Sequence, residues 1–200
     1  MQYDILIAGV GGQGVILASR LLGLAAMKAG LHVTTAETIG MSQREGAVVS
    51  HIRLGNEISG PLIPKAGADL IIGMEPSEAV RNMPMLKQSG HMVVNTAPVI
   101  PASVAIGLSQ YDVSEILVFI NNTCKNAILV DATKLAKQAG NHKSANVVLL
   151  GVAAAADLLP FNISILQQAL EEELPKKYLE ANKKSFEIGI NMLYNMKNKI

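Results

Sequence analysis

A glycine-rich segment near the start of the chain has the residue types and spacing of a ligand-binding turn. Gly9, Gly11 and Gly14 form a G-x-G-x-x-G pattern, and Gly12 and Gln13 lie between its last two glycines. This pattern lets the chain turn sharply and a neighbour approach the backbone, and it leaves N–H groups at a helix N-terminus that can bind a phosphate or carboxylate. Gln13 adds an amide that can reach across an interface. We therefore predict that these five residues bind a ligand or a partner.

The same glycine pattern has two other interpretations. In nicotinamide-dependent enzymes it opens a dinucleotide site, and Glu37, at the end of the second predicted strand, stands where a carboxylate would bind the ribose. Alternatively, the glycines only permit a tight turn from strand to helix. The pattern supports a bound dinucleotide and a purely structural turn about equally.

A second polar segment, residues 37–46, is predicted to form a loop after the second strand. It leaves that strand at the carboxyl edge of the sheet, beside the glycine turn, where open α/β sheets bind ligands. Arg44 is the natural partner for an anion there, and Ser42 and Gln43 can donate hydrogen bonds. The alternative, of equal weight, is an exposed loop with a solvated arginine.

Three further polar residues are given structural roles. Cys124 has no neighbouring base in the sequence and is expected to be a buried thiol rather than a reactive one. His51 is out of phase with the apolar positions of its strand, so we place it on the opposite face as an ordinary sheet residue. Asp131 ends a strand just before a helix and is expected to cap that helix.

Hydrophobic periodicity and turn residues predict alternating strands and helices. Strands are expected at residues 3–8, 31–36, 47–54, 68–73, 91–95 and 127–130, and residues 57–59 are expected to pair back across Gly55-Asn56. Helices are expected at residues 13–29, 76–88 with an interruption at Pro84, 114–123, 132–139, 144–158, 163–174 and 177–197.

The order of these elements predicts the fold class. The first strand, the first helix and the second strand form a βαβ unit, which feeds a parallel sheet. We expect an α/β, Rossmann-like fold with an open, mostly parallel sheet and helices on both faces. Residues 1–200 are interpreted as a single domain, in which residues 144–200 form a helical C-terminal layer.

Composition excludes several classes of function. The 17 basic residues are balanced by 16 acidic ones and Trp is absent, which argues against nucleic-acid binding. The one cysteine cannot form an internal disulfide, and with four scattered histidines it cannot supply an iron–sulfur or structural zinc site. We therefore expect no metal or redox cofactor on this chain alone.

The apolar character of the chain indicates a partner rather than a membrane. Half of the residues are hydrophobic and only 16% are charged, so part of the apolar surface is expected to be buried against another protein. The apolar run at residues 147–156 is too short to span a bilayer. Strand character begins at residue 2, which leaves no room for a signal peptide, and a cytoplasmic location is expected.

Two spaced motifs carry a resemblance to a known family. GVGGQGVILAS, from Gly9, and ETIGMSQREGAVVSHIRLG, from Glu37, resemble the gamma-type subunits of the 2-oxoacid:ferredoxin oxidoreductases, and within them the small subunits that serve indolepyruvate. The resemblance covers essentially the whole chain, including residues 130–136 and 140–146. It implies a subunit of an anaerobic enzyme that oxidatively decarboxylates arylpyruvates to aryl-acetyl-CoA and reduces ferredoxin.

The resemblance also implies where the cofactors and partners are. Thiamine diphosphate, Mg²⁺ and [4Fe-4S] clusters are expected on a large partner subunit, which passes electrons to ferredoxin, with CoA as cosubstrate. A hetero-oligomer follows, with a homodimer as the alternative for the isolated chain. The resemblance also favours Asn146 as a residue that binds loops at the carboxyl edge.

One residue departs from the family pattern, and two other functions remain open. Glu45 stands where relatives have glycine after the Ser-Gln-Arg triplet, and this puts anion binding by Arg44 in doubt. The alternatives are a gamma subunit for pyruvate, 2-oxoglutarate or a branched-chain 2-oxoacid, and a stand-alone dinucleotide-binding protein.

Overall fold

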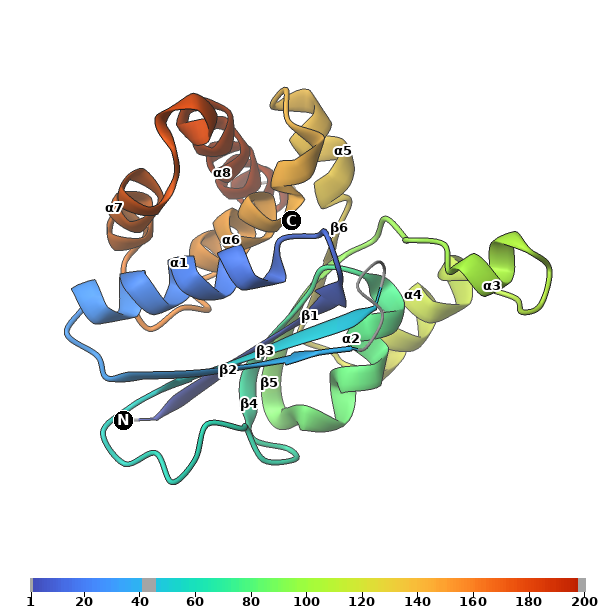
Figure 1. Cartoon of the computed structure of the whole chain (residues 1–200), viewed down its shortest axis with the longest axis horizontal. Helices are drawn as coiled ribbons and strands as arrows, with labels where there is room; N and C mark the ends of the chain where they lie inside the picture. Colours follow the sequence, from blue (N-terminus) through green and yellow to red (C-terminus); the bar gives the residue numbers. More distant parts are fainter. Residues whose placement is uncertain (1, 41–45, 198–200) are drawn as a thin grey trace.

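The computed structural model describes residues 2–40 and 46–197, and it is built around one mixed sheet of six strands (Figure 1). The strand order across the sheet is β2-β3-β1-β4-β5-β6. The strands are β1 (Tyr3–Val10), β2 (Val33–Ile39), β3 (Ala47–Leu54), β4 (Ala68–Gly73), β5 (Leu86–Asn95) and β6 (Ala127–Val130). Apart from the polar first half of β5, these segments are rich in β-branched or other apolar residues, which favour strands.

Only β3 runs against the other strands. β1, β4, β5 and β6 pair in parallel, whereas β3 pairs antiparallel with both β1 and β2. The predicted mostly parallel sheet is therefore confirmed. The expected hairpin at residues 57–59 is wrong, because β3 pairs instead with β2 and Gly55 N donates to His32 O at 3.0 Å. β3 thus occupies the place beside β1 that a simple βαβ unit would give to β2.

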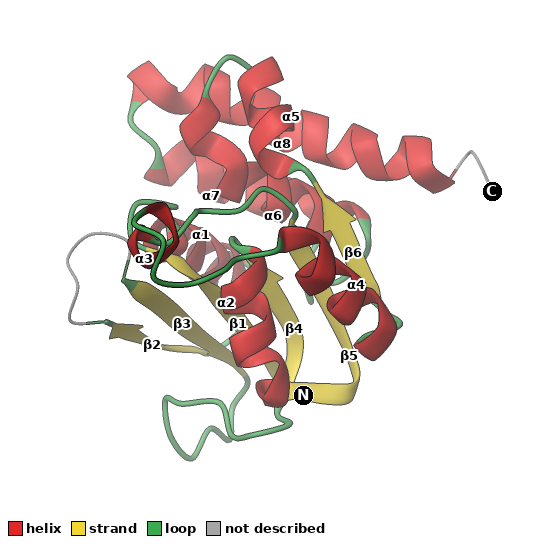
Figure 2. Ribbon diagram, turned by 90° about the vertical axis from the view of Figure 1, so that its right-hand side faces the viewer, coloured by secondary structure: helices red, strands yellow, loops and turns green. Residues whose placement is uncertain are grey.

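Helices cover both faces of the sheet, as predicted (Figure 2). One face carries α2 and α4, and the other carries α1, α6, α7 and α8, with α5 beside them. The helices are α1 (Val15–Lys28), α2 (Pro76–Asn82), α3 (Ala102–Ala105), α4 (Val113–Thr123), α5 (Ala132–Gln138), α6 (Ala145–Ala155), α7 (Ile163–Glu173) and α8 (Lys176–Lys197), with short 3-10 turns η1 (Met83–Met85) and η2 (His142–Ser144).

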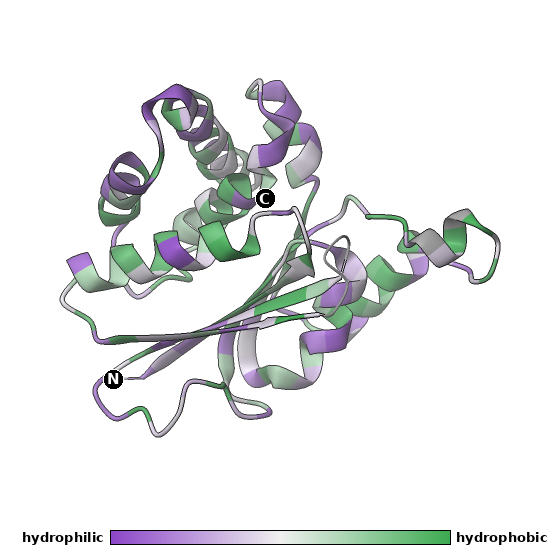
Figure 3. Ribbon diagram, in the orientation of Figure 1, coloured by the Kyte–Doolittle hydropathy of each residue, from purple (hydrophilic) through white to green (hydrophobic). Residues whose placement is uncertain are grey.

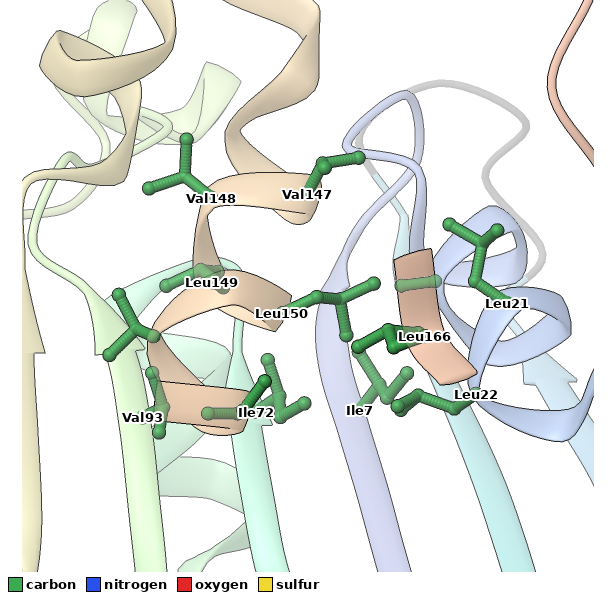
Figure 4. Packing of buried hydrophobic residues seen from close by; sticks show 14 of the residues in the cluster. Ile7, Leu21, Leu22, Ile72, Val93, Val147, Val148, Leu149, Leu150 and Leu166 are labelled. Carbon is green, nitrogen blue, oxygen red and sulfur yellow. The ribbon is translucent and has the colours of Figure 1, made fainter. Parts of the chain in front are cut away.

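The main hydrophobic core lies between the sheet and the layer of α1, α6 and α7 (Figure 4). Every residue of α6 from Asn146 to Ala155 is buried, so this helix is enclosed between the sheet and α8. The side chains drawn at the centre are Ile7, Ile72 and Val93 from the sheet, Leu21 and Leu22 from α1, Val147 to Leu150 from α6, and Leu166 from α7. Figure 3 shows the matching pattern, with hydrophobic residues on α1 and α6 and many hydrophilic ones on α7 and α8.

Pro84 ends the predicted helix at residues 76–88 early. The helix stops at Asn82, η1 contains Pro84, and β5 already begins at Leu86. A proline inside a helix removes one hydrogen bond and clashes with the preceding turn, which explains the interruption. Within the described residues, every helix is too short or too polar to span a membrane.

A buried ion pair joins β1 to β3. Arg53 Nε lies 3.0 Å from Asp4 Oδ1, and the two side chains are 8% and 2% exposed. The Arg53 guanidinium also donates to the carbonyls of Gly60 and Leu62, at 2.8 and 3.2 Å. The pair therefore holds the long connection between β3 and β4 against the sheet.

Candidate functional site at the carboxyl edge of the sheet

The glycine turn opens onto a cavity at the carboxyl ends of β1, β4 and β5. The cavity has a volume of about 250 Å³. Its walls come from the turn after β1, the ends of β4 and β5, the start of α5, and the η2–α6 junction. The lining residues are Gly12, Gln13, Met74, Asn95, Thr133, His142, Lys143, Ala145, Asn146 and Leu149. The glycine turn therefore lies at the carboxyl edge of the sheet, where open α/β sheets bind ligands, and its role in binding stays a prediction.

Gln13 closes the turn from within. Its Oε1 accepts a hydrogen bond from Val10 N at 2.9 Å, and its Nε2 donates to Met74 O at 3.0 Å. The amide therefore ties the turn to the end of β4. Both of its polar atoms are engaged inside the chain, and its predicted role at an interface stays a prediction.

The glycines are required by close neighbours and by backbone conformation. A Cβ at Gly9 would lie 2.8 Å from both Gln13 Oε1 and Met74 Cβ. Gly12 and Gly14 have φ values of 92° and 77°, which side chains rarely adopt. Gly11 N donates to Gly46 O at 2.9 Å. The turn is thus a packed structural junction, and the groups that approach Gly9 and Gly14 belong to the chain itself.

Asn146 connects the glycine turn to α6. It is 2% exposed, and its Nδ2 donates to Gly14 O at 3.1 Å. A Cβ at Gly14 would lie 2.5 Å from the same nitrogen, so glycine is needed there on steric grounds as well. The predicted contact between Asn146 and the loops at this edge is therefore present, across 132 residues of sequence.

Asn95 is a central residue of the site that the sequence analysis did not select. It ends β5, is 2% exposed, and its Nδ2 donates at 3.1 Å to both Met74 O and Thr133 Oγ1. Its Oδ1 accepts from Ala132 N at 3.0 Å. The available signal was a polar residue at the end of an apolar strand, which in a parallel sheet lies at the ligand-binding edge.

A second, larger groove begins where the first cavity ends. It has a volume of about 680 Å³ and lies between α1, η2 and the turn from α7 to α8. Lys143 and Asn146 line both spaces. Lys143 is exposed, so its ammonium group is available to an anion that spans the two. The sequence analysis missed Lys143 because nothing in its local sequence distinguishes it from the other surface lysines.

Glu37 lies apart from this cavity. It is exposed on β2, opposite Ser50 of β3, so β3 separates its strand from β1. A ribose-binding carboxylate belongs to the strand beside the glycine turn, and here that strand is β3. The predicted loop at residues 37–46 also begins later, because Glu37 to Ile39 are still in β2.

Ser42, Gln43 and Arg44 lie outside the described residues, as does Glu45. The residues on either side of this segment are described. Gly40 N donates to Ala47 O at 2.8 Å, and Gly46 O accepts from Gly11 N. Gly46 therefore lies next to the glycine turn, and the proposed role of residues 42–44 in binding stays a prediction.

A buried carboxylate at the end of β4 also went unnoticed in the sequence. Glu75 is 1% exposed and caps α2, because its Oε2 accepts from Ser77 N at 2.8 Å and Glu78 N at 3.0 Å. Its Oε1 accepts from the Tyr111 hydroxyl. Burial and this carboxylate raise the pKa of Tyr111. Glu75 therefore anchors the segment before α4 to the sheet edge.

Asp131 and Cys124 have the structural roles predicted for them. Asp131 Oδ1 accepts from Lys134 N at 2.8 Å and caps α5. Cys124 is 7% exposed, and burial raises the pKa of its thiol. An iron–sulfur cluster needs several thiolates, so a chain with one cysteine does not fit such a cluster. No group of three or more His, Cys, Asp or Glu among the described residues is arranged to hold a metal ion.

His51 faces away from the main core, as its phase in the strand predicted. It is 8% exposed, and its Nδ1 accepts a hydrogen bond from Ile63 N at 3.2 Å. Burial, with a contribution from Arg53, lowers its pKa below the ordinary 6.5. The folded chain therefore holds a neutral imidazole that the unfolded chain protonates more easily.

This shift predicts how stability depends on pH. Because the unfolded state binds the proton first, stability should decrease as the pH falls below about 6.5. His51→Gln should flatten this decrease in the free energy of unfolding between about pH 7 and pH 5.5, measured by urea titration at each pH. His32→Gln, at an exposed histidine, is the control substitution. A slope that His51→Gln does not alter would contradict the assignment.

Taken together, the edge has the features of a binding site. Its three amide side chains hold the turn, β4, β5 and α6 in place through backbone hydrogen bonds. Thr133 and Lys143 add a hydroxyl and a cation at the cavity wall. Preorganised amides beside the exposed Lys143 ammonium suit recognition of an anion.

Comparison with known proteins shows which family the whole chain resembles. Residues 4–192 match the model of the family described as pyruvate ferredoxin/flavodoxin oxidoreductase. The chain is 38% identical to indolepyruvate oxidoreductase subunit IorB of Archaeoglobus fulgidus, over 96% of this chain and 95% of that one. It is 37% identical to subunit IorB of Pyrococcus horikoshii, over 98% of both chains.

A solved structure has the same fold. The gamma subunit of keto/oxoacid ferredoxin oxidoreductase from Geobacter sulfurreducens superposes with a TM-score of 0.69 at 21% identity, over 96% of this chain and 99% of that one. The fold and the extent of the family match point to the same family. The relatives in that family are themselves subunits of larger enzymes. The chain therefore belongs to the pyruvate ferredoxin/flavodoxin oxidoreductase family, as a small subunit of a 2-oxoacid oxidoreductase.

Proposed function

We propose that this chain is the small subunit of an enzyme that oxidatively decarboxylates indolepyruvate and related arylpyruvates to aryl-acetyl-CoA, with reduction of ferredoxin. The observation that carries this proposal is the 34–38% identity, over nearly the full length, to indolepyruvate oxidoreductase subunits of four archaea. Relatives named for 2-oxoglutarate or pyruvate match at only 26–28% identity. The difference favours the arylpyruvate branch of the family.

The redox chemistry in this proposal is carried by a large partner subunit. Decarboxylation of a 2-oxoacid needs an electron sink such as thiamine diphosphate, and the released electrons need a chain of clusters. The single, buried Cys124 supports the assignment of the [4Fe-4S] clusters to that partner. Thiamine diphosphate and Mg²⁺ are assigned to the same partner because the family resemblance implies it. We place the complex in the cytoplasm, where ferredoxin accepts its electrons from the large subunit.

The carboxyl edge is proposed as this chain's contribution to the shared site. We assign binding of CoA or of the partner to the glycine turn with Gln13, to Asn146, and to the segment with Ser42, Gln43 and Arg44. Lys143 supports this assignment, because it lines both the 250 Å³ cavity and the 680 Å³ groove. A cation there suits a phosphate group of CoA.

The subunit assignment is tested by reconstitution. The full chain would be co-expressed with a large thiamine- and cluster-bearing chain, and reduction of a viologen dye would be followed with indolepyruvate, pyruvate and 2-oxoglutarate. Activity should require both chains and CoA and should be highest with indolepyruvate. Equal activity of the isolated small chain would overturn the subunit assignment, and a preference for pyruvate or 2-oxoglutarate would overturn the substrate.

Lys143 gives a sharper test of the edge. In the reconstituted complex, Lys143→Gln should raise the KM for CoA about tenfold and leave the KM for indolepyruvate unchanged, since one charge-assisted contact is lost. Lys137→Gln, at an exposed lysine outside both spaces, is the matched control. A KM for CoA that is the same in both variants would show that CoA does not meet this edge.

A further inference from the structure

We infer that β2 is a self-association surface, through which two copies of this chain join their sheets into one. β2 is the last strand of the sheet, and no strand of the described chain pairs with its outer edge (Figure 2). Such an edge exposes a row of backbone N–H and C=O groups that can pair with another strand. The occupant proposed here is β2 of a second copy.

The outward backbone groups can be identified from the pairing with β3. Gly40 N donates to Ala47 O, and Gly55 N donates to His32 O, so even-numbered residues of this strand direct their backbone groups towards β3. Backbone direction alternates along an antiparallel strand. The odd-numbered residues, Val33, Thr35, Glu37 and Ile39, therefore present their N–H and C=O groups to the outside.

The sequence of β2, VTTAETI, is nearly symmetric about Ala36. Antiparallel pairing with a second copy, centred on Ala36, sets Val33 opposite Ile39, Thr34 opposite Thr38 and Thr35 opposite Glu37. In this register all the outward-facing residues fall in hydrogen-bonded pairs, and no like charges face each other. Pairing centred on Glu37 would instead set that carboxylate against its own copy.

Exposed apolar side chains support the same register. Ile39 is 60% exposed although it lies in a strand, and the pairing sets it against Val33 of the other copy. Val33 Cγ1 lies 3.7 Å from the position of a Cβ at Gly23 of α1. Met27, one turn further on the same helix face, is 58% exposed. The second copy's Ile39 would therefore cover an apolar patch formed by Val33 and Met27.

The edge lacks the features that normally prevent strand pairing. β2 has no proline, its pairing with β3 is free of register shifts, and Glu37 is its one charged residue. The opposite edge of the sheet is protected by its length, because β6 has only four residues. Self-pairing also gives Glu37 a role, opposite Thr35 of the second copy, although it lies apart from the carboxyl-edge site.

Charge substitutions test the register. In sedimentation velocity of the purified full chain over a range of concentrations, Thr35→Glu should raise the dimer dissociation constant about tenfold, because each copy then sets a carboxylate against Glu37. Thr35→Lys should lower it by a similar factor. The double variant Thr35→Glu with Glu37→Lys should lower it as Thr35→Lys does, because it again sets opposite charges against each other.

A backbone substitution tests the edge independently of charge. Thr35→Pro removes an outward N–H without breaking a hydrogen bond to β3, so it should abolish the dimer and leave the circular dichroism spectrum unchanged. Thr35→Val keeps the N–H and is the matched control. A chain that is monomeric at every concentration, or a dimer that Thr35→Pro and Thr35→Glu leave intact, would overturn the inference. So would a Thr35→Pro variant that loses binding to the large subunit but still dimerises.

Discussion

Replacing Gly151 by alanine is expected to lower the free energy of unfolding by about 3 kcal/mol, the upper end for overpacking of a core. A Cβ at Gly151 of α6 would lie 2.3 Å from Phe186 O of α8. Gly189 of α8 makes the reciprocal approach, 2.3 Å from Val148 O. These neighbours are backbone atoms, so α8 would have to move away from α6, which is enclosed against the sheet, and packing between the two helices would be lost.

Gly23→Ala is the matched control for this prediction. Gly23 is also buried within a helix, α1, but the nearest atom to its Cβ would be Val33 Cγ1 at 3.7 Å, an ordinary contact. Alanine should therefore raise the free energy of unfolding by about 0.5–1 kcal/mol, because glycine has more conformational freedom to lose on folding. Urea denaturation measures both. If the two substitutions change stability in the same direction, the crossing of α6 and α8 is not as close as described.

Replacing Arg53 by methionine is expected to cost about 3–5 kcal/mol, because it leaves the carboxylate of Asp4 buried without its counter-charge. Asp4 is 1% exposed as a residue and receives both a guanidinium and the amide of Gln2. Methionine fills a similar volume, so the loss is electrostatic rather than a cavity. The carbonyls of Gly60 and Leu62 also lose their donor.

The loss of stability should be large because the Arg53–Asp4 pair is buried, and an exposed salt bridge should contribute much less. Lys28 and Glu172 form a salt bridge whose side chains are 30% and 58% exposed, and Lys28→Met should change the free energy of unfolding by less than about 1 kcal/mol. Both variants would be compared by urea denaturation at neutral pH. A similarly small effect of Arg53→Met would show that Asp4 reaches water in the variant and would contradict the prediction. Faster proteolysis in residues 55–67 of the Arg53→Met variant would locate the loosened connection.

Local sequence patterns predicted most of the elements. The strands at residues 47–54, 68–73 and 127–130 have the predicted bounds, and the favoured helix over α4 is confirmed. These segments carry apolar periodicity and end signals within a few residues of one another, so short-range information is sufficient. The early end at Pro84 follows from the geometry of a single residue.

Pairing between strands was beyond the reach of such patterns. The apolar residues of β3 suit either direction in a sheet, so its own composition does not set its antiparallel pairing with β1 and β2. Glu37 was misplaced for this reason: its distance from the glycine turn depends on which strand lies next to β1. The inserted β3 changes that neighbour without changing any local motif.

The candidate site divides in the same way. The glycine turn could be recognised from the sequence, because backbone φ values above zero and close approaches restrict residue type at each position. The contacts of Asn95 and Asn146 could not, because an asparagine becomes important only when strand ends and a helix start from distant parts of the chain meet around it. Gln13 shows both cases. Its position in the motif could be recognised from the sequence, but its hydrogen-bond partner, Met74 O, lies 61 residues away in the chain.

The sequence by itself therefore determined most elements of this protein, the α/β class and the position of the glycine turn. These features follow from steric limits and hydrophobic periodicity that act over a few residues. The tertiary structure alone decided the antiparallel insertion of β3, the close crossing of α6 and α8, the free edge of β2, and the amides that meet at the carboxyl edge. Each of these depends on contacts between residues far apart in the chain, whose energies appear only when the segments pack together.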